Sequence, residues 1–72
     1  MRITKRMRLE RALEYLEMER ANEEEAIQRL GGIKIQEVII LRNKKAMYMA
    51  EVDQLIRNTK EKIEQEKEKE TK

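Results

Sequence analysis

The side chains that could do chemistry in this chain of 72 residues are almost all carboxylates and amines. The sequence contains 15 acidic and 17 basic residues, no His, no Cys and no Ser, and Asp53 is its single Asp. Without a thiol, an imidazole or a seryl hydroxyl, catalytic triads built on Ser or Cys are excluded, as are disulfides and zinc sites of Cys and His. Clustered carboxylates remain, and on paired helices they can hold Mg²⁺ for phosphate chemistry.

Two acidic groups could take part in such a site, and both lie in the first half of the chain. They are the helically spaced set Glu10, Glu14 and Glu17 and the consecutive run Glu23, Glu24 and Glu25. In all-helical nucleotide pyrophosphohydrolases, an acidic motif on one helix is completed by Glu-x-x-Asp on another helix. Here the residue three before Asp53 is Ala50, so that second motif is missing. Glu51 is too close to Asp53 in sequence to share its helix face. We therefore expect the Glu residues to form solvated surface pairs, with no enzyme activity, no catalytic residue, no metal site and no cofactor.

A basic cluster at the start of the chain is the candidate nucleic-acid-binding group. Its members are Arg2, Lys5, Arg6, Arg8 and Arg11. Arginine binds phosphates and guanine edges well, so this cluster could contact DNA or RNA. An alternative is structural, because Thr4 can cap a helix and these cations can pair with acids on another part of the chain.

The conformation of residues 2–9 is open at this point. Polar and apolar residues alternate there as in a strand, and a β-ribbon from two paired N-termini is one way to read the major groove. The stretch Gly32-Ile33-Lys34-Ile35-Gln36-Glu37-Val38-Ile39 resembles the entry to the second helix of ribbon-helix-helix repressors. That resemblance, which covers about half the chain, implies a DNA-binding dimer. The helices expected here are longer than that family uses.

Two long helix-compatible segments flank the strong breaker Gly31-Gly32. We predict one domain over residues 1–66, with a helix over about 3–30, a turn at the glycines and a helix over about 34–66, followed by a charged tail over 67–72. A restart of the first helix near Asn22 is possible, because Asn22 and Glu25 could form a capping box. The expected fold is all-α: an antiparallel two-helix hairpin of coiled-coil type.

The apolar residues are arranged as seams with alternating spacings of three and four. The first segment has one seam, interrupted in its middle by two charged residues: Leu9, Leu13, Leu16, Arg20, Glu23, Ile27 and Leu30. The second segment has two adjacent seams, one through Val38, Leu41, Lys45, Tyr48, Val52, Leu55 and Thr59, and one through Ile35, Ile39, Arg42, Ala46, Met49, Asp53, Ile56, Lys60 and Ile63. Two seams indicate burial on two sides, one against the first helix and one against a partner chain. A chain this small also needs a further source of stability, so we expect a homodimer that forms a four-helix bundle.

Opposite charge blocks predict how the two helices align. Folding the chain at the glycines would place the acidic block of residues 14–25 beside Arg42, Lys44 and Lys45, and would bring Tyr15 level with Tyr48. Such surface pairs set register more than they stabilise the fold.

The expected function is non-enzymatic: a small interaction or regulatory protein that binds a macromolecule, with nucleic-acid binding through the Arg-rich start as the alternative. The central packing should involve Leu41, Tyr48, Val52, Leu55 and Ile56. The candidate oligomer or partner surface consists of Ile40, Met47, Ala50 and Lys45. No apolar run approaches the roughly 20 residues of a membrane span, so we expect a cytoplasmic protein with no membrane contact and no small-molecule substrate.

Overall fold

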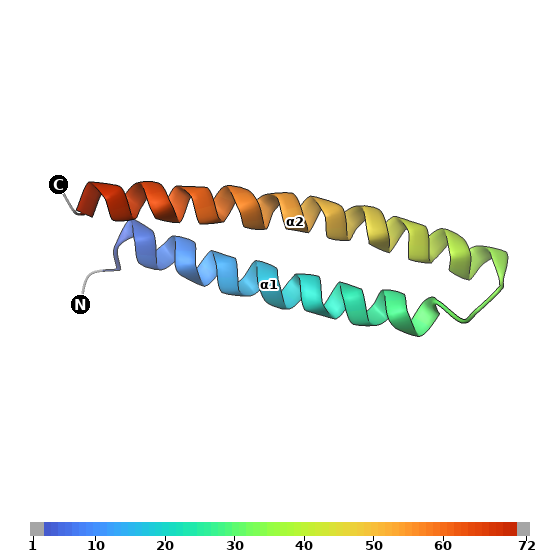
Figure 1. Cartoon of the computed structure of the whole chain (residues 1–72). Coiled ribbons are helices and arrows are strands. Elements are labelled where there is room, and N and C mark those ends of the chain that lie inside the picture. Colours follow the sequence, from blue (N-terminus) through green and yellow to red (C-terminus); the bar gives the residue numbers. More distant parts are fainter. Residues whose placement is uncertain (1–2, 71–72) are drawn as a thin grey trace.

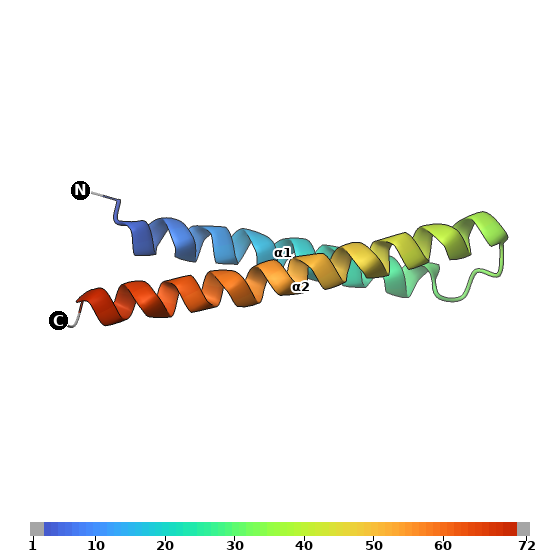
Figure 2. The ribbon, with the colours of Figure 1, turned by 90° about the horizontal axis from the view of Figure 1, so that it is seen from above.

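The computed structural model describes residues 3–70, and these residues form two α-helices and no strand. Helix α1 spans Lys5–Leu30 and helix α2 spans Gln36–Glu70. The helices run antiparallel and pack against each other along their length (Figure 1), so the predicted all-helical hairpin is confirmed. Viewed from above, they cross at a small angle (Figure 2), as wound helices of a coiled coil do.

Helix α1 begins at a side-chain cap. Thr4 has an extended backbone and its hydroxyl accepts a hydrogen bond from the Met7 amide at 3.2 Å, which satisfies one of the free amides of the first turn. The residues from Lys5 onward are helical, so a strand over 2–9 is wrong for Lys5–Leu9, and Arg2 lies outside the described residues. The helix also continues without a break through Asn22.

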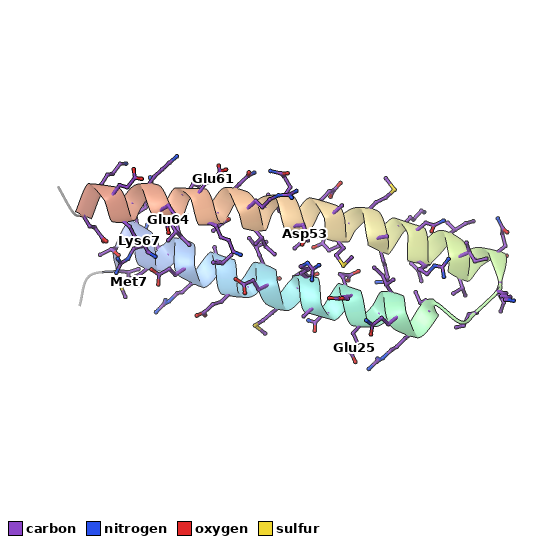
Figure 3. All side chains as sticks on the ribbon, viewed as in Figure 1. Met7, Glu25, Asp53, Glu61, Glu64 and Lys67 are labelled. Carbon is purple, nitrogen blue, oxygen red and sulfur yellow. The ribbon has the colours of Figure 1, made fainter. Side chains whose placement is uncertain are left out.

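Helix α2 extends further than the sequence predicted. Residues 31–35 connect the helices, α2 starts at Gln36, and it includes the first part of the predicted charged tail as far as Glu70. Ion pairs within the helix support this end, because Lys67 pairs with Glu64 at 3.6 Å and Lys69 pairs with Glu66 at 3.4 Å. Figure 3 shows these last turns of α2 beside the first turns of α1.

Helix α1 packs with the seam that the sequence predicted, and every member of it is partly covered. The covered stripe of α2, however, runs between the two predicted seams and takes alternate members from each. Its members are Val38, Arg42, Lys45, Met49, Val52, Ile56, Thr59, Ile63 and Glu66, and Ile39 and Asp53 beside it are also partly covered. In a two-helix coiled coil, α2 contacts α1 along a single stripe of residues with four-three spacing. The remaining members of both predicted seams therefore lie on the sides of the hairpin.

The predicted central packing is therefore only partly right. Val52 and Ile56 are buried, at 2% and 7% exposed, and Ile63 is the third buried residue among those described. Leu41, Tyr48 and Leu55 were also expected in the centre but remain 45%, 43% and 49% exposed. They lie on the α2 side next to the covered stripe, where a single neighbouring helix cannot enclose them.

The alignment of the helices also differs from the simple fold at the glycines. That fold would bring Arg20 level with Asn43, whereas Arg20 pairs with Asp53 in the structure. Tyr48 likewise bonds to Glu19. The connecting segment is longer than a two-residue turn, and the paired residue on α2 is correspondingly further along the chain. The result is a thin rod with extents of 56 × 21 × 13 Å.

Candidate interaction surfaces

The two charged residues within the α1 seam, Arg20 and Glu23, pair with charged residues of α2. The Lys45 Nζ lies 3.4 Å from a Glu23 carboxylate oxygen, with the two side chains 29% and 16% exposed. Arg20 forms a hydrogen-bonded ion pair with Asp53 and a second with Glu24 at 3.1 Å. The bond to Asp53 is the main cause that raises the pKa of Arg20. The two charges that interrupt the α1 seam therefore meet opposite charges on α2.

One side of the hairpin, which we call the Asp53 flank, is charged. An open groove there is lined by Glu17, Arg20, Ala21, Asp53, Ile56 and Lys60. Glu10 and Glu24 lie seven residues to either side of Glu17, and Lys67 lies seven residues after Lys60, so the same side continues along both helices. Arg20 and Asp53 in this groove pair with each other, whereas Glu17 and Lys60 have no ion pair within residues 3–70.

The opposite side, which we call the Tyr48 flank, is mostly apolar. The Tyr48 hydroxyl donates to a Glu19 carboxylate at 3.3 Å, which fixes these two residues on one side of the rod. Leu41 and Leu55 lie seven residues to either side of Tyr48. Ala12 and Ala26 lie seven residues to either side of Glu19. Desolvation is the first cause that raises the pKa of Tyr48, followed by the nearby Glu19 carboxylate, so its phenol is neutral at physiological pH.

The outer surface of α2, turned away from α1, carries most of the predicted partner surface. Figure 3 shows Glu61 projecting from this outer side, and Ile40 and Met47 share its helical position at intervals of seven residues. Ile40 is 44% exposed, Met47 is 70% exposed, and Ala50 next to them is also exposed. Lys45 does not join this surface, because it faces Glu23 between the helices.

The basic N-terminal residues divide into a paired and an unpaired set. Lys5 lies 3.2 Å from Glu66, which is the main cause that lowers the pKa of that carboxyl. Arg6 pairs with Glu70 at 2.7 Å and with Glu10 at 3.2 Å. Arg8 and Arg11 are exposed and have no ion pair within residues 3–70. Of the predicted nucleic-acid contacts that the structure describes, only these two are free.

The acidic run at Glu23, Glu24 and Glu25 does not act as one cluster, because successive residues of a helix point in different directions. Glu23 faces Lys45, Glu24 faces Arg20, and Glu25 pairs with Arg29 on the outer side of α1, where Figure 3 shows it pointing away from α2. Within residues 3–70, no three carboxylates gather closely enough to hold a metal ion.

The sequence reasoning missed the separation of the hairpin into a charged and an apolar flank. A signal was present, since alanines at positions 12 and 26 and large apolar residues at 41, 48 and 55 recur at multiples of seven residues. That signal points to a side only when the line of contact between the helices is known.

A scan against protein-family models, a search of curated proteins and a search of solved structures found no match for this chain. Neither helix of the described residues combines the length and the apolar character that crossing a membrane requires.

Proposed function

We propose that this chain is a non-catalytic interaction protein, a helical hairpin that associates with itself and binds a macromolecular partner. The observation that carries the proposal is the imbalance between buried and exposed apolar residues. Among residues 3–70, three residues are buried, whereas ten large apolar side chains are exposed: Ile3, Tyr15, Met18, Ile33, Ile35, Ile40, Leu41, Met47, Tyr48 and Leu55. Contiguous exposed apolar surface is typical of binding sites.

Half of these exposed apolar residues lie on α2, where two adjoining surfaces serve two contacts in this proposal. The Tyr48 flank is the self-association surface. The outer surface with Ile40 and Met47 is the partner surface, and its chemistry suits a protein that presents an apolar helix face. The flexible thioether of Met47 can adapt to the shape of such a partner.

A capture experiment with a matched control tests partner binding. The immobilised hairpin is compared with the variants Met47→Glu and Met18→Glu, both of which place a charge at an exposed methionine, on the outer side of α2 and of α1 respectively. A partner that binds the proposed surface is retained by the wild type and by Met18→Glu and is lost with Met47→Glu. Equal retention by all three proteins would contradict the assignment of this surface.

Nucleic-acid binding is the second candidate, and the free side chains of Arg8 and Arg11 are the observation that favours it. They lie one helical turn apart on α1, so any contact with phosphates comes from a helix and not from a β-ribbon. Lys5 and Arg6 are already paired with acids of α2, which reduces the cluster to about half of its predicted size.

Binding to labelled duplex DNA and to RNA across salt concentrations tests this candidate. Two phosphate contacts on DNA predict a fall of about 1.8 log units in affinity per log unit of salt. The variant Arg8→Ala with Arg11→Ala should remove that dependence. Binding that is absent at low salt, or unaffected by the variant, would rule the candidate out.

A further inference from the structure

The residues around Tyr48 on α2 form a pattern with two-fold symmetry. Leu41 and Leu55 each lie seven residues from Tyr48, while Lys44 lies four residues before it and Glu51 three residues after it. Lys44 and Glu51 are both exposed and have no ion pair within residues 3–70. The apolar residues are thus symmetric about Tyr48, and the charges change sign across it.

From this pattern we infer the partner of the Tyr48 flank and its orientation: a second copy of the chain, with its α2 antiparallel to the first around a two-fold axis at Tyr48. The inference rests on the self-association in the proposed function. In this arrangement Leu41 of each copy meets Leu55 of the other, the two Tyr48 rings meet at the axis, and Lys44 of each copy pairs with Glu51 of the other. A two-fold interface needs this kind of self-complementary surface, because each contact occurs twice.

The charges decide between the two possible orientations of α2. A parallel pair would place Lys44 beside Lys44 and Glu51 beside Glu51, and like charges in contact disfavour an interface. The antiparallel pair converts both contacts into attractions. Ala12, Glu19 and Ala26 form the α1 part of the flank. Glu19 is bonded to Tyr48, and the small side chains of the two alanines leave room for the second hairpin.

The small core explains why a copy of the chain is the expected occupant. A hairpin with Val52, Ile56 and Ile63 as its buried residues has little stability of its own, and pairing through Leu41, Tyr48 and Leu55 roughly doubles the set of enclosed apolar residues. An unrelated partner would not require the charges to reverse about Tyr48. Two hairpins joined in this way form a four-helix bundle.

Charge-reversal variants test this orientation, and the dimer dissociation constant of each variant is measured by sedimentation equilibrium. Lys44→Glu and Glu51→Lys alone each replace two attractions by two repulsions and should weaken the dimer at least about tenfold. The double variant restores both pairs and should recover wild-type affinity. An equimolar mixture of the two single variants should form a heterodimer, because each Glu then faces a Lys. The control Glu14→Lys, away from this flank, should leave the dimer unchanged.

Disulfide trapping gives a second readout, since the chain contains no cysteine. Mixed Leu41→Cys and Leu55→Cys variants should cross-link to each other upon oxidation, while Leu41→Cys alone should not cross-link. Cross-linking of Leu41→Cys with itself, or charge variants that leave the dimer unaffected, would overturn the antiparallel arrangement. A wild-type protein that stays monomeric at high concentration would overturn the interface itself, and the Met47→Glu capture experiment would still decide partner binding separately.

Discussion

At the scale of single residues, the hairpin has charged side chains in its packing seam, and several of them pair with an opposite charge on the other helix. Lys45 and Glu23 illustrate this, because both side chains are largely covered by the two helices. Because both ions lose hydrating water when such a partly buried pair forms, the intact pair adds little to the stability of the fold. Removing one partner is destabilising, since the other charge then remains covered and unpaired.

We therefore predict that Lys45→Met destabilises the hairpin by about 1 kcal/mol, because it leaves the Glu23 carboxylate covered and unpaired. The double variant Lys45→Met with Glu23→Leu should recover most of that loss, since no uncompensated charge remains. Urea unfolding followed by circular dichroism measures both. If the two single variants and the double variant behaved additively, the pair would not interact in solution.

The ion pair between Glu66 and Lys5 predicts sensitivity to acid. Because the pKa of Glu66 is lowered in the folded state, the folded state favours the carboxylate over the acid. The resulting stability is present above the ordinary pKa of a glutamic acid and is lost as the pH falls through the lowered pKa. The thermal midpoint should therefore drop on acidification from neutral pH, and Glu66→Gln should lower it at pH 7 and flatten this dependence. A Glu14→Gln control, at an exposed carboxylate with no ion pair within residues 3–70, should keep the wild-type pH profile.

At the scale of the elements, the two glycines end α1 without adopting a conformation that only glycine tolerates. Gly31 has φ −63° and ψ −25°, and no described glycine has a positive φ. The glycines interrupt the helix because their backbone loses the most entropy on ordering, not because of chirality.

This geometry predicts different outcomes for alanine at the two positions. No atom lies within 4 Å of a Cβ added at Gly32, so Gly32→Ala should stabilise the hairpin by about 0.4–1 kcal/mol through the unfolded state. At Gly31 the added carbon would approach the Gln28 carbonyl oxygen to 3.3 Å, so Gly31→Ala should gain less or lose stability. Denaturant midpoints compare the two variants. Equal gains would show that the tight contact at Gly31 relaxes freely.

At the scale of the whole molecule, the hairpin is a thin rod in which few side chains are enclosed. Helix α2 has 35 residues, and a helix of that length spans about 52 Å, close to the 56 Å length of the rod. One layer of side chains between two helices covers only one side of each helix. The proposed dimer would cover a second side of α2 and so add to the stability of the rod.

We predict that the thermal midpoint rises with protein concentration, as expected when folding and dimerisation are coupled. Leu55→Glu should abolish this dependence and lower the midpoint, because it places a charge on the Tyr48 flank. Met18→Glu, at a similarly exposed position on α1, should keep it. Calorimetry over a hundredfold range of concentration provides the measurement, and a constant midpoint for the wild type would mean that the hairpin folds alone.

The two helices of this protein follow from local features of its sequence. Four-three spacing, few helix breakers and the paired glycines near the middle of the chain are local signals, and they predicted two helices, the turn between them and the packing seam of α1. The cap at Thr4 could also be predicted from the sequence, because its hydroxyl accepts a hydrogen bond from a residue only three positions away.

The line of α2 that faces α1, and therefore the side of the rod that is apolar, became known from the packing of the two helices. The two adjacent seams of α2 are similarly apolar. If α2 were rotated by one residue position, Leu41, Tyr48 and Leu55 would face α1 in place of Met49 and Ile63. That choice depends on the length of the connection and on pairs such as Arg20 with Asp53 that join distant parts of the chain. Periodicity along one helix contains no information about such contacts, because they exist only when both helices are in place.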